Sequence, residues 1–339
     1  ETRKLDRDLF NEAYLMHTST SPQYAIIASL DVAAAMMEPP GGTAFVEESI
    51  VEALDFRRAM RKVDEEFGLD WWFKVWGPED VTSDSWGMAN RSEWELDPND
   101  DWHGFDGLVP GFNMLDPIKS TVITPGLNIK GEFDARGIPA SIVTKYLAEH
   151  GVIVEKTGLY SFFIMFTIGI TKGRWNTLLT ALQQFKDDYD KNQPMWRVLP
   201  EFCAKQPQYE RVGLADLCQQ LHDMYKANDI ARLTTEMYLS NMTPAMKPAE
   251  AFGYLAHRKT QRVPIDELEG RITTSLLTPY PPGIPLLIPG ERFNKIIIQY
   301  LQFARRFNAE FPGFEADIHG LVEQQADGRI EYFVDCVPA

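Results

Sequence analysis

Residues 137–169 constrain the fold most strongly, because a helical pattern and two apolar runs follow one another there with only short connections. Apolar residues recur at helical spacing after Pro139, and Gly151 supplies the left-handed conformation that ends many helices. The runs 152–154 and 162–168 are short and bounded by glycines, which is typical of strands buried on both faces. The sequence therefore predicts a helix, a strand, a turn and a second strand. The apolar helix positions are Ile142, Val143, Tyr146 and Leu147.

Glu155 lies at the end of the first apolar run. An acid at the point where a buried strand opens into a turn is either a solvated strand end or a charge directed into a cleft. Charged side chains are mostly exposed, so the spacing alone favours the solvated strand end. Both interpretations stay open on this pattern.

The flanking segments predict an open-faced α/β layer, with elements in the order strand, helix, strand, strand, helix. The run Pro39-Pro40-Gly41-Gly42 marks a break before these elements, and residues 195–275 have a mostly helical pattern. The other expected elements are an amphipathic helix from Val46 to Val63, strands over 71–76 and 115–122, a helix after an N-cap at Thr171, a helix from Glu291 to about Asn308, and two strands ending near Val334.

A cluster of hydroxyl groups precedes an alanine-rich segment, 24–37, whose pattern predicts a helix packed closely against something large. Thr18, Ser19 and Thr20 form the centre of this cluster. Such hydroxyls can cap the helix through a side-chain oxygen, and the same exposed N–H groups and helix dipole can hold a phosphate. Capping is the commoner role, so the residues alone favour it.

His103 stands beside aromatic residues, in the run Trp102-His103-Gly104-Phe105. The surrounding polar, Trp-rich stretch, 77–110, shows no clean period and predicts an ordered long loop. A His in this setting can stack or transfer a proton, but a hydrogen-bonded structural His is more common.

Charge and composition exclude several classes of partner. The net charge is −16, the pI is near 4.9 and no run of Lys and Arg is long enough to form a basic stripe, so neither nucleic acid nor an anionic membrane is an expected partner. No apolar run approaches the ~18 residues of a membrane span. Cys203, Cys218 and Cys336 are too widely spaced for a disulfide framework or a metal site, which fits a reducing cytoplasm. Phosphate-loop and zinc-binding motifs do not occur.

Seven blocks together are more specific than any single motif. In order, they are FNEAYLMHTSTSPQYAIIAS from Phe10, WHGF from Trp102, LDPIK from Leu115, GIPASIV from Gly137, HGVIVEKTG from His150, PYPPGIPL from Pro279 and FPGFEADIHG from Phe311. They resemble the C-terminal half of the bacterial inducible lysine/arginine/ornithine decarboxylases, pyridoxal 5'-phosphate enzymes of the aspartate-aminotransferase fold (fold type I). The resemblance implies that residues 1–40 end the large cofactor-binding domain. Residues 41–339 would then form the C-terminal α/β domain, with a mostly helical insertion at about 195–275.

The resemblance also implies a chemistry, which is loss of the α-carboxylate with the cofactor ring as electron sink. In the family a Ser-x-His-Lys motif supplies the lysine that binds the cofactor covalently, and no such motif occurs here. The opening ETRKLDRDLF reads as the inside of a longer polypeptide. We therefore expect the cofactor lysine upstream of Glu1, and we expect the chain alone to be inactive.

Some family roles carry over to this chain residue by residue. Thr18, Ser19 and Thr20 correspond to the hydroxyl motif that reaches the cofactor phosphate across the dimer interface. Glu155 matches the acid of the Glu-Lys-Thr-Gly motif, which faces the distal amine of the substrate. Within this resemblance, His103 belongs to a candidate active-site loop.

The stretch 154–158, Val-Glu-Lys-Thr-Gly, is most similar to the lysine enzymes, so the resemblance favours decarboxylation of L-lysine to cadaverine and CO2. Arginine or ornithine as substrate stays open, as does a noncatalytic assembly or regulatory module of the same fold. Family members form homodimers with shared active sites and stack into decamers. Some bind a guanosine-tetraphosphate alarmone through a basic residue and a Gly where Glu38-Pro39 stands here, so weak or absent alarmone inhibition is expected.

Overall fold

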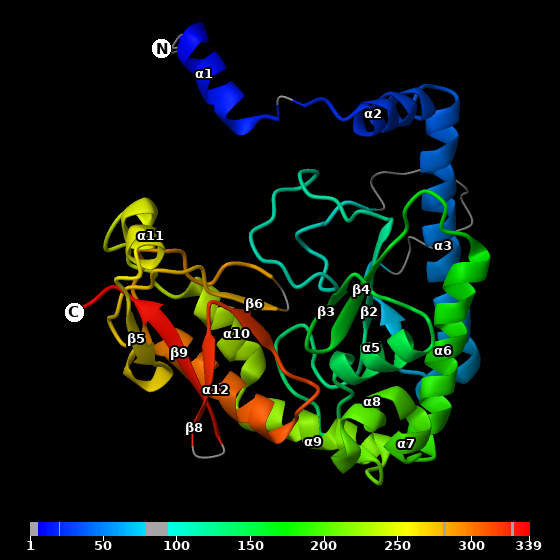
Figure 1. The fold of residues 1–339 in the computed structure, drawn as a ribbon. Coiled ribbons are helices and arrows are strands. Elements are labelled where there is room, and N and C mark those ends of the chain that lie inside the picture. Colours follow the sequence, from blue (N-terminus) through cyan, green and yellow to red (C-terminus); the bar gives the residue numbers. More distant parts are fainter. Residues whose placement is uncertain (1–5, 20, 79–93, 281–282, 327–328) are drawn as a thin grey trace.

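The computed structural model describes residues 6–19, 21–78, 94–280, 283–326 and 329–339. A mixed α/β body carries an arm made of two helices, as Figure 1 shows. The helices are α1 (Arg7–His17), α2 (Tyr24–Met36), α3 (Gly41–Phe67), α5 (Ala140–Glu149), α6 (Lys172–Asp190), α7 (Met195–Val198), α8 (Pro200–Lys205), α9 (Leu214–Ala227), α10 (Ile230–Leu239), α11 (Pro248–Ala256) and α12 (Lys295–Glu310). The strands are β1 (Lys74–Val75), β2 (Lys119–Ile123), β3 (Lys156–Thr157), β4 (Ser161–Met165), β5 (Gln261–Pro264), β6 (Thr278–Tyr280), β7 (Asp317–His319), β8 (Val322–Ala326) and β9 (Arg329–Cys336).

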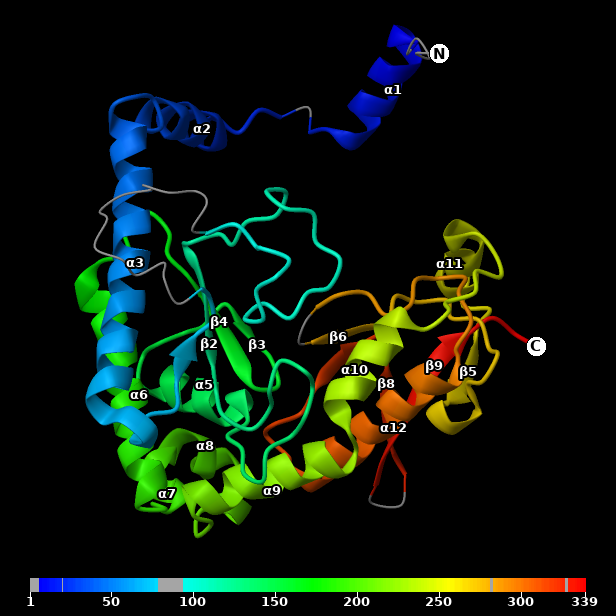
Figure 2. The same ribbon diagram turned by 180° about the vertical axis from the view of Figure 1, so that it is seen from behind.

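A four-stranded antiparallel sheet, in the order β1-β2-β4-β3, forms the centre of the first half of the body. The long helices α3 and α6 lie side by side along it in the opposite views of Figures 1 and 2. Phe56 of α3 packs its ring 6.1 Å from that of Trp175 of α6 and 5.5 Å from that of Phe166, which directly follows β4. This packing gives the sheet a rigid apolar backing.

The helix predicted after Pro139 is confirmed as α5. Its four expected apolar positions are all buried, and Gly151 follows it with a φ of +76°. The helix predicted from Val46 to Val63 is also confirmed, as the longer α3. The helix expected after Thr171 is α6, although the Thr171 side chain makes no capping hydrogen bond.

The strand expected at 152–154 is wrong. β3 begins only at Lys156, and the side chain of Ile153 is 80% exposed. β4 is not buried on both faces either, because Phe162 is buried whereas Met165 is 37% exposed. The predicted pattern belongs to parallel sheets covered on both sides, and this antiparallel sheet leaves part of its surface open.

Other strands and helices differ from the prediction in extent. The strand expected over 71–76 is reduced to β1, and that over 115–122 becomes β2. The helical pattern of 195–275 holds through α11 and then gives way to β5. The end of the chain forms three strands, β7, β8 and β9, instead of two.

The second half of the body contains the sheet β5-β9-β8 and the pair β6-β7, packed with α10 and α12. One cluster of buried side chains runs without interruption from Ala53 in α3 to Cys336 in β9. The two halves therefore share a core. Among the described residues, no helix is long and apolar enough to cross a membrane.

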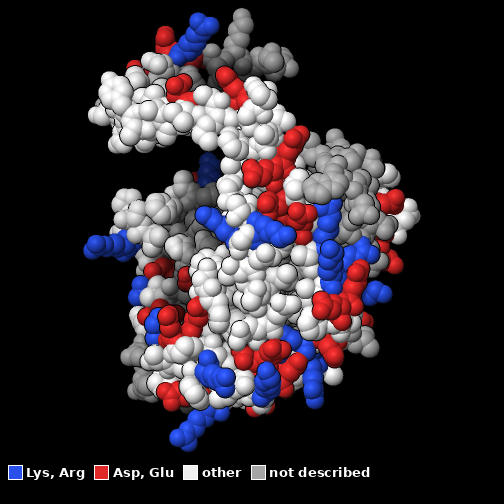
Figure 3. Space-filling view, turned by 90° about the vertical axis from the view of Figure 1, so that its right-hand side faces the viewer, with Lys and Arg blue, Asp and Glu red and all other residues white. Residues whose placement is uncertain are grey.

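The arm formed by α1 and α2 has no buried residue in the structure. The sequence predicted that α2 packs closely against something large, and nothing within the described chain covers it. The chain turns sharply between α2 and α3, where a Cβ on Gly42 would lie 2.2 Å from the carbonyl oxygen of Met37. Figure 3 shows this largely uncharged arm above a body on which both signs of charge are interspersed.

Candidate active site

Glu155 lies just before β3, and its side chain is exposed. Its backbone N–H donates to the carbonyl of Phe163 at 2.9 Å. Within the described part of the chain, its carboxylate has no hydrogen bond or ion pair. A carboxylate without an internal partner is available to hold an ammonium group by charge-assisted hydrogen bonds.

The hairpin β3–β4 that carries Glu155 is tied to its neighbours near its turn. The N–H of Gly158 donates to the carbonyl of Ser161 at 2.7 Å, and the N–H of Ala140 donates to the carbonyl of Leu159 at 2.9 Å. The Thr157 hydroxyl donates to that of Thr144 in α5 at 3.2 Å. The position of Glu155 is therefore determined by its backbone, because its side chain makes no hydrogen bond or ion pair with the residues that the structure describes.

The hydroxyl cluster does not cap α2, contrary to the interpretation that the residues alone favour. The Thr18 hydroxyl donates to the carbonyl of Tyr14 at 3.0 Å, and Ser19 Oγ accepts from the N–H of Ser21 at 3.2 Å. The N-cap of α2 is Gln23, which makes no side-chain capping hydrogen bond. The first turn of α2 therefore has backbone N–H groups free of a side-chain cap. Thr20 lies outside the described residues.

His103 is buried, and both of its ring nitrogens are engaged by the backbone. Nδ1 accepts from the N–H of Phe105 at 3.0 Å, so Nε2 carries the proton that is donated to the carbonyl of Asp97 at 2.8 Å. The ring also stacks on Phe105, with 5.8 Å between centroids. This geometry matches the hydrogen-bonded structural alternative, since neither nitrogen is open to a substrate.

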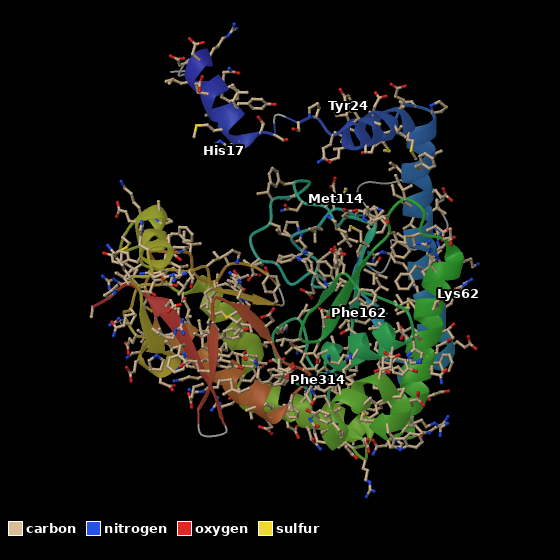
Figure 4. All side chains as sticks on the ribbon, viewed as in Figure 1. His17, Tyr24, Lys62, Met114, Phe162 and Phe314 are labelled. Atoms are coloured by element: carbon tan, nitrogen blue, oxygen red, sulfur yellow. The ribbon has the colours of Figure 1, made fainter. Side chains whose placement is uncertain are left out.

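The candidate residues do not come together within one copy of the chain. Figure 4 shows His17 and Tyr24, which flank the hydroxyl cluster, on the arm and well separated from Phe162 in β4. Glu155 belongs to the hairpin that contains β4. Over the residues that the structure describes, no three His, Cys, Asp or Glu side chains group in a way that could hold a metal ion.

Two buried polar groups were not singled out by the sequence pattern. Arg57 donates to the carbonyls of Trp76 at 3.0 Å and Lys119 at 3.1 Å, which ties α3 to the strands beside it. Burial lowers the pKa of its guanidinium to about 10, and the Asp116 carboxylate opposes that change. His222 is fully buried and hydrogen-bonded at both ring nitrogens. Their partners lie far away in sequence, so no local motif reveals either group.

Comparison with known proteins gives two family matches. Residues 1–174 match the Orn/Lys/Arg decarboxylase major domain, and residues 231–338 match the Orn/Lys/Arg decarboxylase C-terminal domain. The major-domain match extends across the boundary proposed after residue 40 and continues to residue 174.

Similar proteins are lysine decarboxylases. Lysine decarboxylase LdcA of Pseudomonas aeruginosa is 49% identical over 99% of this chain and 45% of its own length. The inducible lysine decarboxylase of Escherichia coli K12 is 39% identical over 96% of this chain and 45% of its own length. The solved structure of lysine decarboxylase A from Pseudomonas aeruginosa covers 99% of this chain and 45% of that chain, with a TM-score of 0.91 and 49% identity.

The chain thus spans about half the length of the curated relatives that it matches. Together, the two domain matches extend over both halves of the body and the arm. The chain belongs to the Orn/Lys/Arg decarboxylase family.

Proposed function

We propose that the full-length enzyme converts L-lysine to cadaverine and CO2, and that this chain supplies the carboxylate that recognises the distal amine. The observation that carries the proposal is the exposed carboxylate of Glu155, free of internal partners, on a hairpin fixed by its backbone. The lysine decarboxylases that match nearly the whole chain support lysine as the substrate. A relative named arginine decarboxylase is 36% identical, and one named ornithine decarboxylase is 30% identical.

Glu155 would pair with the ε-ammonium of lysine at the end of the substrate remote from the α-carbon. The ion pair holds one end of the substrate while the α-carboxylate is positioned for loss as CO2 at the other end. Only a substrate of the right length can satisfy both positions. A site that holds a charged group loses much of its binding when the group falls short, because the carboxylate then stays unpaired. This is how one acid can favour lysine over the shorter ornithine.

Pyridoxal 5'-phosphate, when bound, supplies the electron sink for the carbanion that remains after CO2 leaves. The residues present fit the phosphate end of this cofactor. Thr18 and Ser19 carry exposed hydroxyls, and they adjoin the uncapped N-terminus of α2. Together with Thr20, they would hold the phosphate of a cofactor bound by the partner subunit. The Ser-x-His-Lys motif that would bind it covalently is not in this sequence.

A homodimer, stacked into decamers, is the assembly that we propose for the full-length enzyme, in the cytoplasm. The support from this chain is the arm, whose side chains are all exposed although many are large and apolar. A partner subunit that covers the arm would remove this surface from water. It would also bring the hydroxyl cluster to a second copy of the site.

The test is Glu155→Gln in the full-length holoenzyme. We expect the KM for lysine to rise at least about tenfold, the equivalent of ~1.4 kcal/mol, because the ammonium loses its counter-charge. The visible absorbance of the bound cofactor should not change. Glu250→Gln, an exposed acid in the first turn of α11, is the matched control and should leave KM unaltered.

Equal losses of lysine affinity and cofactor binding in Glu155→Gln would mean that the acid is a solvated strand end. A full-length protein that binds no cofactor would instead support a noncatalytic module of the same fold. Parallel assays with lysine, arginine and ornithine identify the substrate.

A further inference from the structure

Side chains on one face of α9 donate hydrogen bonds to two consecutive backbone carbonyls of the loop that precedes α5. Gln219 Nε2 donates to the carbonyl of Ala135 at 3.2 Å. His222 Nε2 and Lys226 Nζ donate to the carbonyl of Asp134, at 3.1 Å and 2.7 Å. The three side chains are spaced by three and four residues, so they project from one face of the helix. α9 thereby fixes the path of this loop.

His222 is also hydrogen-bonded to the turn of the β3–β4 hairpin. Its Nδ1 lies 2.7 Å from the hydroxyl of Tyr160, and both side chains are buried. Because a carbonyl can only accept, Nε2 carries a proton. In the tautomer whose single ring proton is on Nε2, Nδ1 accepts and the Tyr160 hydroxyl donates. Burial raises the pKa of Tyr160, which keeps that hydroxyl protonated.

Two glycines allow the loop to approach these two rings closely. A Cβ on Gly137 would lie 2.0 Å from His222 Nδ1, and a Cβ on Gly126 would lie 2.5 Å from the ring of Tyr160. The end of β2 is bonded to the same turn, since the N–H of Thr124 donates to the carbonyl of Tyr160 at 2.9 Å. β2, the loop, the hairpin turn and α9 therefore meet at one tightly packed junction.

The hairpin depends on this junction because β3 is an edge strand of only two residues, paired with β4 alone. Glu155, immediately before β3, has no polar side-chain contact in the described chain to hold it. The side-chain hydrogen bonds that fix the hairpin to helices are Tyr160 to His222 and Thr157 to Thr144. A movement at the turn therefore shifts the Glu155 carboxylate.

We infer that Tyr160 and His222 are positioning residues for the distal-amine site, and that α9 sets the distance at which Glu155 meets its substrate. This inference rests on the proposed function of Glu155. Recognition of substrate length requires a fixed distance between the Glu155 carboxylate and the reacting end of the substrate. Displacement of a binding group by about 1 Å weakens substrate binding. The pair acts through the hairpin and does not itself touch the substrate.

The test compares Tyr160→Phe, His222→Gln and His222→Asn in the full-length holoenzyme. Tyr160→Phe removes the donor, and His222→Gln keeps a donor near the Asp134 carbonyl but removes the Nδ1 acceptor. We expect each to raise the KM for lysine about three- to tenfold, with kcat within about twofold and the cofactor absorbance unchanged. The ratio of kcat/KM for lysine to that for ornithine should fall. His222→Asn places an amide oxygen near the position of the lost Nδ1. This acceptor should return the KM for lysine most of the way to that of the parent enzyme.

Tyr332→Phe is the matched control, because Tyr332 is also buried and its hydroxyl accepts from Asn308 Nδ2 at 3.0 Å, within the other half of the body. It should lower the unfolding temperature without a change in KM or in substrate ratio. Calorimetric binding of cadaverine provides a readout independent of turnover, and it should weaken in Tyr160→Phe and His222→Gln but not in Tyr332→Phe.

If Glu155→Gln raises KM but Tyr160→Phe behaves as Tyr332→Phe does, the positioning role is wrong and the proposed function stands. If Glu155→Gln leaves the KM for lysine unchanged, the proposed function of Glu155 and the positioning role are both wrong. Equal KM values for His222→Gln and His222→Asn would also overturn the inference, because the acceptor at Nδ1 would then be irrelevant.

Discussion

Gly137→Ala is the substitution for which the structure gives the sharpest expectation. The added Cβ would lie 2.0, 2.6 and 2.9 Å from Nδ1, Cε1 and Cγ of His222. These distances are far inside van der Waals contact, and His222 is fully buried and bonded at both nitrogens, so the ring cannot swing away cheaply. Either the loop moves away from α9 or the ring moves away from Tyr160.

The expected loss of stability follows from these two alternatives. Overpacking in a well-packed core costs ~1–3 kcal/mol, and loss of the Tyr160–His222 hydrogen bond adds about 1 kcal/mol. For a full-length enzyme about twice as long as this chain, 1 kcal/mol corresponds to a shift on the order of 0.5–1 °C. Gly137→Ala should therefore lower the unfolding temperature of the full-length enzyme by roughly 1–4 °C.

Gly253→Ala is the matched control, because it is the same change inside α11 with no atom within 4 Å of the added Cβ. It should stabilise by ~0.5–1 kcal/mol, since glycine inside a helix loses more backbone entropy than alanine on folding. The two variants are compared by thermal unfolding, with His222→Ala and the double variant Gly137→Ala/His222→Ala. Removal of the ring makes room for the new methyl group, so the double variant should be more stable than the summed single effects imply. Full additivity, or a Gly137→Ala variant as stable as the parent, would refute the packing argument.

Two further predictions concern acid stability and regulation. Arg305 donates to Asp266 and holds the pKa of that carboxyl below its ordinary value, although burial opposes this. The resulting stabilisation is fully present above about pH 4, the range of the unfolded carboxyl, and is lost as pH falls through the folded value. Asp266→Asn should therefore flatten the acid limb of a plot of unfolding temperature against pH, and an unchanged limb would contradict this. The family resemblance implies an alarmone site made by a basic residue and a Gly where Glu38-Pro39 stands here, so the full-length enzyme should keep its activity with micromolar guanosine tetraphosphate. Marked inhibition would show the reverse.

The sequence predicts α5 well because four apolar positions at helical spacing all face the core. It fails at 152–154, because an apolar run does not reveal whether a sheet will cover it. Ile153 is a large apolar residue that remains 80% exposed. The hydroxyl cluster shows a similar limit, since the N-cap of α2 is Gln23 and the hydroxyls of Thr18 and Ser19 bond to their own neighbours.

The candidate site is predictable only in part. Glu155 follows from its place in a short motif, and the structure then shows a carboxylate without internal partners. The Tyr160–His222 contact joins residues 62 positions apart, and each side chain looks ordinary in its own segment. Pairings of this kind depend on how α9 packs against the loop before α5, which no local pattern encodes.

The shared core has a consequence for recombination among relatives. α9 lies between the two family-matched ranges and contributes to both halves: His222 contacts the turn at Tyr160, and Tyr225 stacks on Phe307 of α12 with 5.3 Å between ring centroids. A chimaera joined on either side of this helix would separate one of these contacts from its partner sequence. The C-terminal domain is therefore not an interchangeable cassette, and an exchange that preserves function must keep α9 matched to the residues it meets on both sides.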